Sequence, residues 1–268
     1  MFNLVRMDIR RLFRNRGFYI MLGMTAALIA GMILLLSMVS DPEAMDAMQA
    51  KGADIDEIDR QETAAIRTMP QMEFTYECLS SGFLLVMTGI GITLFVNSDF
   101  SSGCIKNICF ARPNRRDYVF SKILLTGIYS GILTILGVLI TLICPVLVGM
   151  RLEAASVIAL LQYTFWLWLP HWAFGLMALA LVLLTRSSTL GIVLAVISGG
   201  GVTAAVLQLV CQQLNWPPLD QYLLSSVEGS QCIPMLGAQQ MGMILACTLG
   251  WAAVYGIGSL IMIEKRDI

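Results

Sequence analysis

The chain has 268 residues, of which 57% are hydrophobic and only 13% are charged, and its formal net charge is −1. A soluble domain carries about 25% charged residues, so this composition and a mean hydropathy of +0.76 exclude an ordinary soluble protein. The seven cysteines form no CxxC or Cys/His pattern, which argues against a metal site. We therefore predict an all-α polytopic membrane protein.

The first basic segment, residues 2–16, has the pattern of an amphipathic helix. Its apolar stripe consists of Phe2, Val5, Ile9, Leu12 and Phe13. Arginines spaced four residues apart occupy the other side, as is typical of a helix that lies in the membrane interface. We predict that the arginines of this segment anchor it to anionic headgroups: Arg6, Arg10, Arg11, Arg14 and Arg16.

Six apolar runs are long enough to cross a hydrocarbon core of about 30 Å at 1.5 Å per residue. They lie at about residues 17–39, 79–97, 121–146, 157–184, 190–211 and 240–263. The first run is too long for the core of a signal peptide and lacks a convincing cleavage site, so we expect it to remain as a spanning helix. The sequence thus predicts a single domain, residues 1–268, with six transmembrane helices and an N-terminal interfacial helix.

Charge asymmetry predicts the orientation of these spans. If both termini are cytoplasmic, all but four of the 17 basic residues lie inside, and the exceptions are Lys51, Arg60, Arg67 and Arg151. Most of the 18 acidic residues lie outside. An excess of Lys and Arg in cytoplasmic segments is the usual arrangement in membrane proteins. The distribution therefore predicts that both termini lie in the cytoplasm.

Two outer loops are expected, and their compositions differ. Residues 40–77 are acidic and helical in pattern, which predicts a solvated helical hairpin. Residues 212–239 carry few charges and include Trp216 and Tyr222, which favour the headgroup level, so this segment is expected to dip into the interface. Cys211 and Cys232 lie near the same membrane side, which leaves a disulfide between them open.

The cytoplasmic loop, residues 98–120, is a long polar segment with a dense block of positive charge between two apolar runs. We expect Asp99 to cap the N-terminus of a short helix whose apolar side includes Ile105 and Phe110. Gly103 and Pro113 punctuate the segment. A short, partly apolar helix held outside a membrane by basic flanks is a docking surface for a partner protein.

The spans contain few groups that could perform chemistry. No Asp or Glu falls near the middle of any span, which argues against a carrier driven by protons or sodium through buried carboxylates. His171, beside Pro170, is the one ionisable residue deep in a span. Two interpretations stay open: a neutral imidazole bonded to a backbone carbonyl that Pro170 frees, or a translocation path shared with Gln162 and Trp172.

Glycines mark two further features of the spans. Gly199, Gly200 and Gly201 interrupt the fifth span, which indicates either a close packing surface or a flexible hinge. Gly127 and Gly131 form a GxxxG pattern in the third span. Small residues let helices approach closely, so we expect this pattern to pack within the chain or against a second copy.

With this topology, the cytoplasmic loop resembles that of the ABC type-2 permease family. The resemblance rests on these segments: Asp99-Phe100-Ser101-Ser102-Gly103, Ile105-Lys106-Asn107, Arg112-Pro113, Arg115-Arg116 and Ser121-Lys122. The N-terminal helix and the entry to the first span also look like those of permeases of Firmicutes. Together with the six-span plan, the resemblance covers essentially the whole chain and identifies a family rather than a member.

This resemblance implies the membrane subunit of an ATP-driven exporter in a bacterial plasma membrane. Two permeases, identical or homologous, would pair above two separate ATPase subunits. Those subunits would bind ATP and Mg, whereas this chain would bind no cofactor, metal or nucleic acid. Residues 99–110 would form the coupling helix, and the docking residues would be Asp99, Phe100, Gly103, Ile105, Lys106, Asn107, Pro113, Arg115 and Arg116. A peptide antibiotic or another amphiphile is the leading expectation for the substrate.

The residues alone favour a similar function, because a polytopic chain with a docking loop and no energy-coupling residues needs an energised partner. The sequence contains no GxxxxGK[ST], HExxH or GxSxG motif, so neither a P-loop nor a recognised hydrolase site is present. Two alternatives stay open. A non-transporting scaffold or sensor would use the same docking loop, and an intramembrane enzyme centred on His171 would need a nucleophile or metal nearby.

Overall fold

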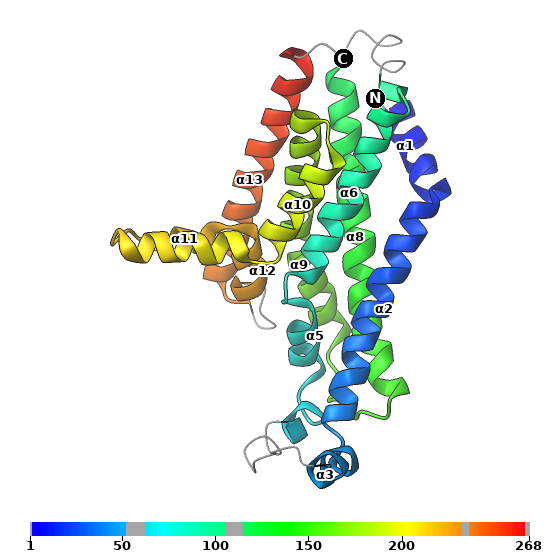
Figure 1. Cartoon of the computed structure of the whole chain (residues 1–268), viewed down its shortest axis with the longest axis vertical. Coiled ribbons are helices and arrows are strands. Elements are labelled where there is room, and N and C mark those ends of the chain that lie inside the picture. The colour runs from blue at the N-terminus through cyan, green and yellow to red at the C-terminus, as the bar shows by residue number, and fades with distance from the viewer. Residues whose placement is uncertain (1, 52–62, 106–114, 232–235, 266–268) are drawn as a thin grey trace.

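The computed structural model describes residues 2–51, 63–105, 115–231 and 236–265 (Figure 1). Within these ranges the chain forms helices and no strand. The helices are α1 (Phe2–Arg14), α2 (Arg16–Val39), α3 (Pro42–Ala50), α5 (Gln71–Leu79), α6 (Phe83–Ser101), α8 (Arg116–Leu147), α9 (Val157–Thr185), α10 (Ser188–Gly199), α11 (Val202–Gln213), the 3-10 turn η1 (Leu219–Tyr222), α12 (Leu224–Gln231) and α13 (Ala238–Lys265). The predicted all-α class is confirmed.

Five helices are long and apolar enough to cross a membrane, namely α2, α6, α8, α9 and α13. They contain 19 to 32 residues, and at 1.5 Å per residue even the shortest nearly matches a core of about 30 Å. A sixth candidate span consists of α10 and α11, which bend by 58° where they meet. The polytopic architecture expected from hydropathy is therefore present, with five or six candidate spans.

The second span begins and ends later than the predicted residues 79–97. Leu79 ends α5, and Gly82, whose φ is 72°, turns the chain into α6. At the other end α6 continues through Asp99 to Ser101. The apolar run over residues 79–97 therefore overlaps two helices. Leu79 belongs to the first of them, α5, where its side chain is buried in the bundle.

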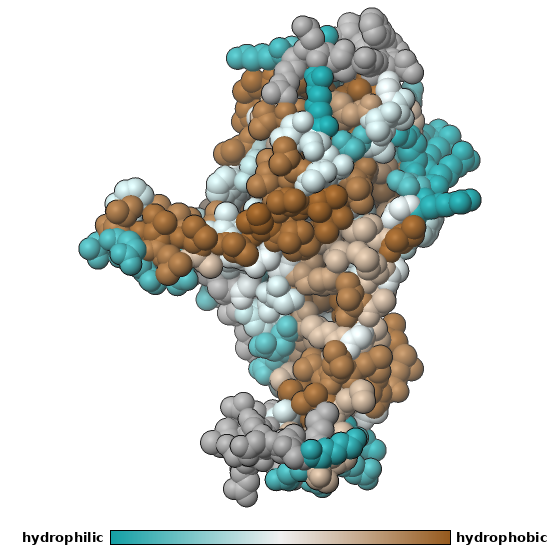
Figure 2. Space-filling view, viewed as in Figure 1, coloured by the Kyte–Doolittle hydropathy of each residue, from teal (hydrophilic) through white to brown (hydrophobic). Residues whose placement is uncertain are grey.

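The fifth predicted span, residues 190–211, is broken at the glycine triplet, where the sequence indicated an interruption. α10 ends at Gly199, and Gly201, at φ 79°, starts α11. Glycine stabilises a helix interior by about 1 kcal/mol less than alanine and adopts positive φ without strain, which explains a break at this point. α11 then projects sideways from the bundle (Figure 1), and much of its visible surface is apolar (Figure 2). Flexibility at this break stays a prediction.

α9 is the most buried of the spanning helices and forms the centre of the bundle. It packs against α6, α8, α10, α12 and α13. On its α8 side, Trp168 Nε1 donates a hydrogen bond to Gly127 O at 2.9 Å, and the rings of Trp168 and Trp172 stack. A side chain at Gly127 or Gly131 would press on these indoles. The GxxxG pattern thus packs within the chain.

The two ends of the bundle differ. The N-terminus and the end of α13 lie at the same end, together with α1, the end of α6 and the start of α8 (Figure 1). α3 and α5 lie at the opposite end. The expected hairpin over residues 40–77 is helical at α3 and α5, and residues 52–62 lie outside the described residues. Shared placement of the termini agrees with an even number of crossings.

The close contact at Gly82 predicts a stability difference between two glycine variants. Gly82→Ala adds a Cβ that clashes with the carbonyl oxygen of Gly199, whereas Gly201→Ala meets no atom within 4 Å. Both positions have positive φ, which costs a non-glycine residue about 1–2 kcal/mol. We expect Gly82→Ala to lower the free energy of unfolding by clearly more than Gly201→Ala, as measured by denaturant unfolding in detergent. Equal losses would show that α6 and α10 do not approach closely.

Candidate functional site

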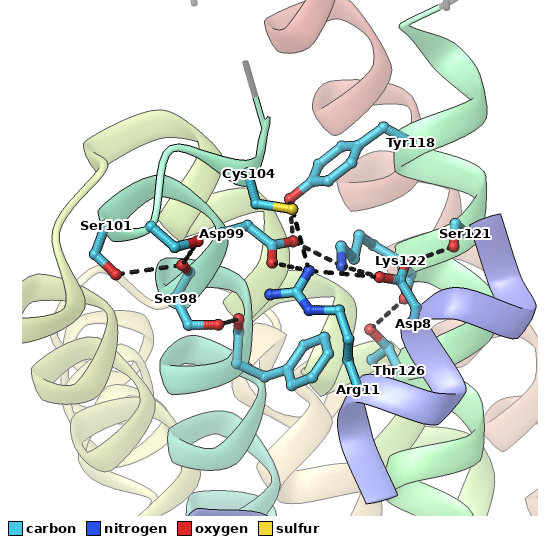
Figure 3. Close-up of polar contacts among 12 residues, drawn as sticks. Asp8, Arg11, Ser98, Asp99, Ser101, Cys104, Tyr118, Ser121, Lys122 and Thr126 are labelled. Atoms are coloured by element: carbon cyan, nitrogen blue, oxygen red, sulfur yellow. Dashed lines mark hydrogen bonds and ion pairs between the residues drawn. The ribbon is translucent and has the colours of Figure 1, made fainter. Parts of the chain in front are cut away.

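Two acidic and two basic side chains meet where α1 crosses the end of α6 and the start of α8. These four residues, the four-charge cluster, are Asp8 and Arg11 of α1, Asp99 of α6 and Lys122 of α8 (Figure 3). Asp8, Asp99 and Lys122 are buried, with no more than 1% of each residue exposed. Arg11 is half-buried at the edge of the cluster. Three helices far apart in the sequence are therefore joined by charge.

α1 brings Asp8 to this position through a stripe that sequence analysis did not identify. Leu4, Asp8 and Leu12, spaced four residues apart, are buried, and residues at this spacing share one helix face. Leu12 was expected to face lipid but packs in the core, whereas Phe13 of the predicted stripe is 45% exposed. α1 therefore docks on α8 through a face that contains a carboxylate.

Lys122 is the centre of the cluster. Its Nζ lies 2.9 Å from Asp8 Oδ1 and 2.7 Å from Asp99 Oδ2. The ammonium also lies 4.9 Å from the ring centroid of Phe95, a position that favours cation–π attraction. A buried ammonium is tolerated only when it is paired and hydrogen-bonded. Lys122 meets this requirement through carboxylates from two different helices.

Hydroxyl groups and Arg11 complete the bonding of the two carboxylates. The hydroxyl of Tyr118 donates to Asp99 Oδ2 at 3.0 Å, and that of Ser121 donates to Asp8 Oδ2 at 2.6 Å. Arg11 Nη1 lies 2.7 Å from Asp99 Oδ1 and 3.7 Å from Cys104 Sγ. Burial disfavours the charge on Arg11, but the adjacent Asp99 carboxylate outweighs burial and raises the pKa of Arg11. The cluster is thus neutral overall.

The cluster corrects three expectations about the docking loop and the interfacial arginines. Asp99 is not the N-cap of a separate helix: it lies inside α6 because Arg11 and Lys122 hold it in the bundle. Ile105 packs in the apolar core rather than on an outer docking face. Arg11 points towards Asp99, whereas the other four predicted anchors are exposed: Arg6, Arg10, Arg14 and Arg16.

The remaining predicted docking residues lie around the end of the bundle. Phe100, in the last turn of α6, lies beside Arg186, whose Cζ is 6.0 Å from the ring centroid of Phe100. Gly103 has a φ of 68°. Arg115 donates to Ile263 O at 3.5 Å, and Arg116 pairs with Glu264 of α13. Lys106, Asn107 and Pro113 lie outside the described residues. The start of α8 is thus also joined to the end of α13.

The structure does not bring Gln162, His171 and Trp172 onto one path. Gln162 is exposed, Trp172 Nε1 donates to Ile123 O of α8 at 3.2 Å, and His171 is buried on a different side of α9. The imidazole Nδ1 lies 2.7 Å from Leu167 O. The partner of Nδ1 is therefore a backbone carbonyl, as one interpretation expected. It is the carbonyl of Leu167, however, and not that of Trp166, which lacks its usual helical donor because Pro170 has no N–H.

Sequence analysis missed the acidic partner of His171. Glu228 of α12 is fully buried, and its Oε1 lies 3.3 Å from His171 Nε2. No Asp or Glu lies near the middle of a predicted span, but Glu228 reaches the interior of the bundle because the last outer segment folds back against α9. The sequence of that segment contained one usable signal of a buried partner, which is its single Glu, Glu228, among apolar and small residues.

Other candidate sites are limited. No group of three or more His, Cys, Asp or Glu side chains that could hold a metal ion occurs among the described residues. Cys211 is buried in α11, and Cys232 lies outside the described residues, so a bridge between them stays a prediction.

The four-charge cluster predicts a large loss of stability when its central cation is removed. Lys122→Met leaves two buried carboxylates with Arg11 as the one cation within 4 Å of them among the described residues. Breaking a buried ion pair in this way costs about 3–5 kcal/mol. We expect that loss in the free energy of unfolding in detergent. Arg10→Gln, an exposed change on the same end of the molecule, should change it by less than about 0.5 kcal/mol.

A second substitution distinguishes charge imbalance from loss of packing. Lys122→Met removes one positive charge, and adding Asp99→Asn removes one negative charge, so the double variant restores the charge balance of the cluster. We expect the double variant to recover part of the stability lost in Lys122→Met. A double variant whose loss equals the sum of the two single losses would show that the two groups do not interact.

Comparison with known families gives one match. The model of the ABC-2 family transporter protein matches residues 4–200, which is most of the chain. The matched range begins in α1, ends at the glycine break after α10, and includes every residue of the four-charge cluster and His171. Glu228 lies beyond it. No curated protein matches the chain.

Proposed function

This chain belongs to the ABC-2 family of transporter proteins, and from that premise we propose that it exports a substrate by coupling its spans to a separate ATPase. The family supports the assignment of a membrane permease subunit. The chain has no P-loop sequence of its own, so ATP and Mg would bind to the partner. The chain itself would bind no cofactor. A second permease, identical or homologous, would complete the transporter.

The four-charge cluster is the observation that carries this proposal. It lies where α6 leads into the segment that resembles a coupling loop and where α8 leaves that segment. Lys122 bonds to Asp8 on α1 and Asp99 on α6. Because the charges cannot separate without a large cost, displacement of the loop by an ATPase would move all three helices together.

A docking surface remains available although Asp99 and Ile105 are buried. Ser101 and Ser102 at the end of α6 and Arg116 at the start of α8 are exposed at the same end of the bundle. We propose that these residues border the ATPase contact, with the positively charged segment 106–114 between them. The positive-inside pattern supports placing this end in the cytoplasm of a bacterium.

The substrate class is proposed from the bundle surface and composition. The chain has extensive apolar surface, including the projecting α11 (Figure 2). An amphiphile such as a peptide antibiotic could enter from the bilayer along such a surface without crossing water. A scaffold or sensor would share the docking loop but would not couple ATP hydrolysis to movement of a substrate.

Co-purification from the native cell in mild detergent tests the proposal, with partners identified by mass spectrometry and ATPase activity measured in the eluate. We compare the wild type with Ser102→Trp, which adds bulk at the proposed contact, and with Ala154→Trp, an exposed change near the N-terminus of α9. We expect an ATPase with a Walker motif to bind the wild type and Ala154→Trp, and at least tenfold less of it to bind Ser102→Trp.

Two outcomes would count against the proposal. If no ATPase is present in the wild-type eluate, the proposal that the chain is a transporter subunit is contradicted. Equal recovery of the ATPase with Ser102→Trp and Ala154→Trp would place the contact elsewhere on the chain. If the ATPase binds but is not stimulated by any amphiphile in reconstituted vesicles, the scaffold function would replace export.

A further inference from the structure

The second buried polar centre, the pair His171 and Glu228, lies at a junction of several helices. α12 carries Glu228 and packs against α9, α10 and α13. A Cβ added at Gly82, the residue before α6, would lie 4.0 Å from Glu228 Oε2 and against the carbonyl of Gly199. The carboxyl group thus lies between the middle of α9, the start of α6 and the end of α10. Both side chains are fully buried.

The hydrogen bond of Nδ1 fixes the state of the imidazole. Leu167 O, 2.7 Å from Nδ1, is a carbonyl oxygen and can only accept. Nδ1 therefore carries a hydrogen, and in a neutral imidazole the other nitrogen, Nε2, then has a lone pair and no hydrogen. Nε2 lies 3.3 Å from Glu228 Oε1.

This geometry requires one additional proton. Without it, a lone pair on Nε2 and a negative carboxylate oxygen would face each other in a buried site, which is repulsive and leaves the carboxylate without compensation. Among the described residues, neither Glu228 oxygen has a hydrogen-bond donor from elsewhere. A proton on Nε2 makes an ion pair, and a proton on Oε1 makes a neutral hydrogen bond. In both cases the closed pair holds one proton.

The surroundings contribute no competing charge. The helices packed against α12 are α9, α10 and α13, and η1 precedes it. Their titratable residues are Tyr163 and His171 on α9, none on α10, Asp220 and Tyr222 on η1, and Cys247, Tyr255, Glu264 and Lys265 on α13. Glu264 and Lys265 lie in the last turn of α13, where Glu264 pairs with Arg116. α5, whose Tyr76 donates to Gly229 O, also carries Glu73, Glu77 and Cys78. Burial raises the pKa of Glu228, and the adjacent His171 opposes that effect. The N-terminus of α6 favours negative charge nearby, so it favours the proton on Nε2.

We propose that His171 and Glu228 form a proton-binding site that fastens α12 to α9. The ligand is a single proton, bound when the folded-back segment is packed and released when α12 separates from the bundle. This inference goes beyond export function and does not depend on it, because it concerns how one segment of the chain is held. It gives the closing segment of the last loop a dependence on pH.

The sign of that dependence follows from counting protons. The packed state holds the additional proton. In the separated state an imidazole in water binds it only below about pH 6.5, and the carboxylate does not bind it above about pH 4.5. Above about pH 6.5, separation therefore releases a proton and becomes more favourable by up to about tenfold per pH unit. Below that value the proton count does not change and the equilibrium is flat.

Hydrogen exchange of the α12 peptide in lipid nanodiscs tests this site between pH 5 and 9. We use the ratio of exchange rates in the wild type and in Glu228→Gln at each pH, because intrinsic chemical exchange cancels in the ratio. Glutamine is neutral, and its amide N–H can donate to Nε2 without a titrating proton. The ratio should rise by up to about tenfold per pH unit. His171→Gln, whose amide donates to a carboxylate, provides a second comparison whose ratio should rise only above about pH 6.5.

Glu77→Gln is the matched control, because Glu77 is an exposed acid on α5, the helix that contacts α12 through Tyr76. The ratio of wild type to this control should be constant from pH 5 to 9. A constant ratio for Glu228→Gln or His171→Gln would overturn the proposal, since the pair would then hold no titrating proton. If Glu228→Gln does not fold, the His171→Gln comparison decides alone, and these outcomes are independent of ATPase binding.

Discussion

A single buried ammonium sets the arrangement of the end of this bundle. Lys122 is compensated only if a carboxylate arrives from α1 and another from α6, so none of the three helices can take another position without exposing an unpaired charge to a low dielectric. The neighbouring hydroxyls and Arg11 depend on the same arrangement. The N-terminal helix is therefore part of the bundle.

Much of the fold follows from sequence because long apolar runs, basic flanks and glycine clusters act locally. The spans, the amphipathic α1 and the break at Gly199–Gly201 are of this kind. The four-charge cluster is not: Asp8, Asp99 and Lys122 each look like ordinary residues flanking a span, and only tertiary packing brings them together. The four-residue spacing of Asp8 with Leu4 and Leu12 was the available signal, but the stronger arginine pattern on the same helix obscured it.

The pair His171 and Glu228 could not be predicted for a different reason. His171 was identifiable as an ionisable residue in a span, but its partner lies 57 residues further along the chain, in a segment whose composition indicated an interface loop. The described residues thus include two buried centres that pair ionisable side chains, one joining α1, α6 and α8 and the other joining α9 and α12. The first joins the three helices that meet at the proposed ATPase contact, and the second is proposed to hold the segment before the last span.

The most direct test of the account is an experimental structure, by cryo-electron microscopy, of the chain in complex with its partner ATPase. The account predicts that the ATPase contacts the end of the bundle formed by Ser101, Ser102 and Arg116, with the Lys122 contacts to Asp8 and Asp99 intact. An ATPase bound at the opposite end, beside α3 and α5, or a complex in which Lys122 has left both carboxylates, would contradict it.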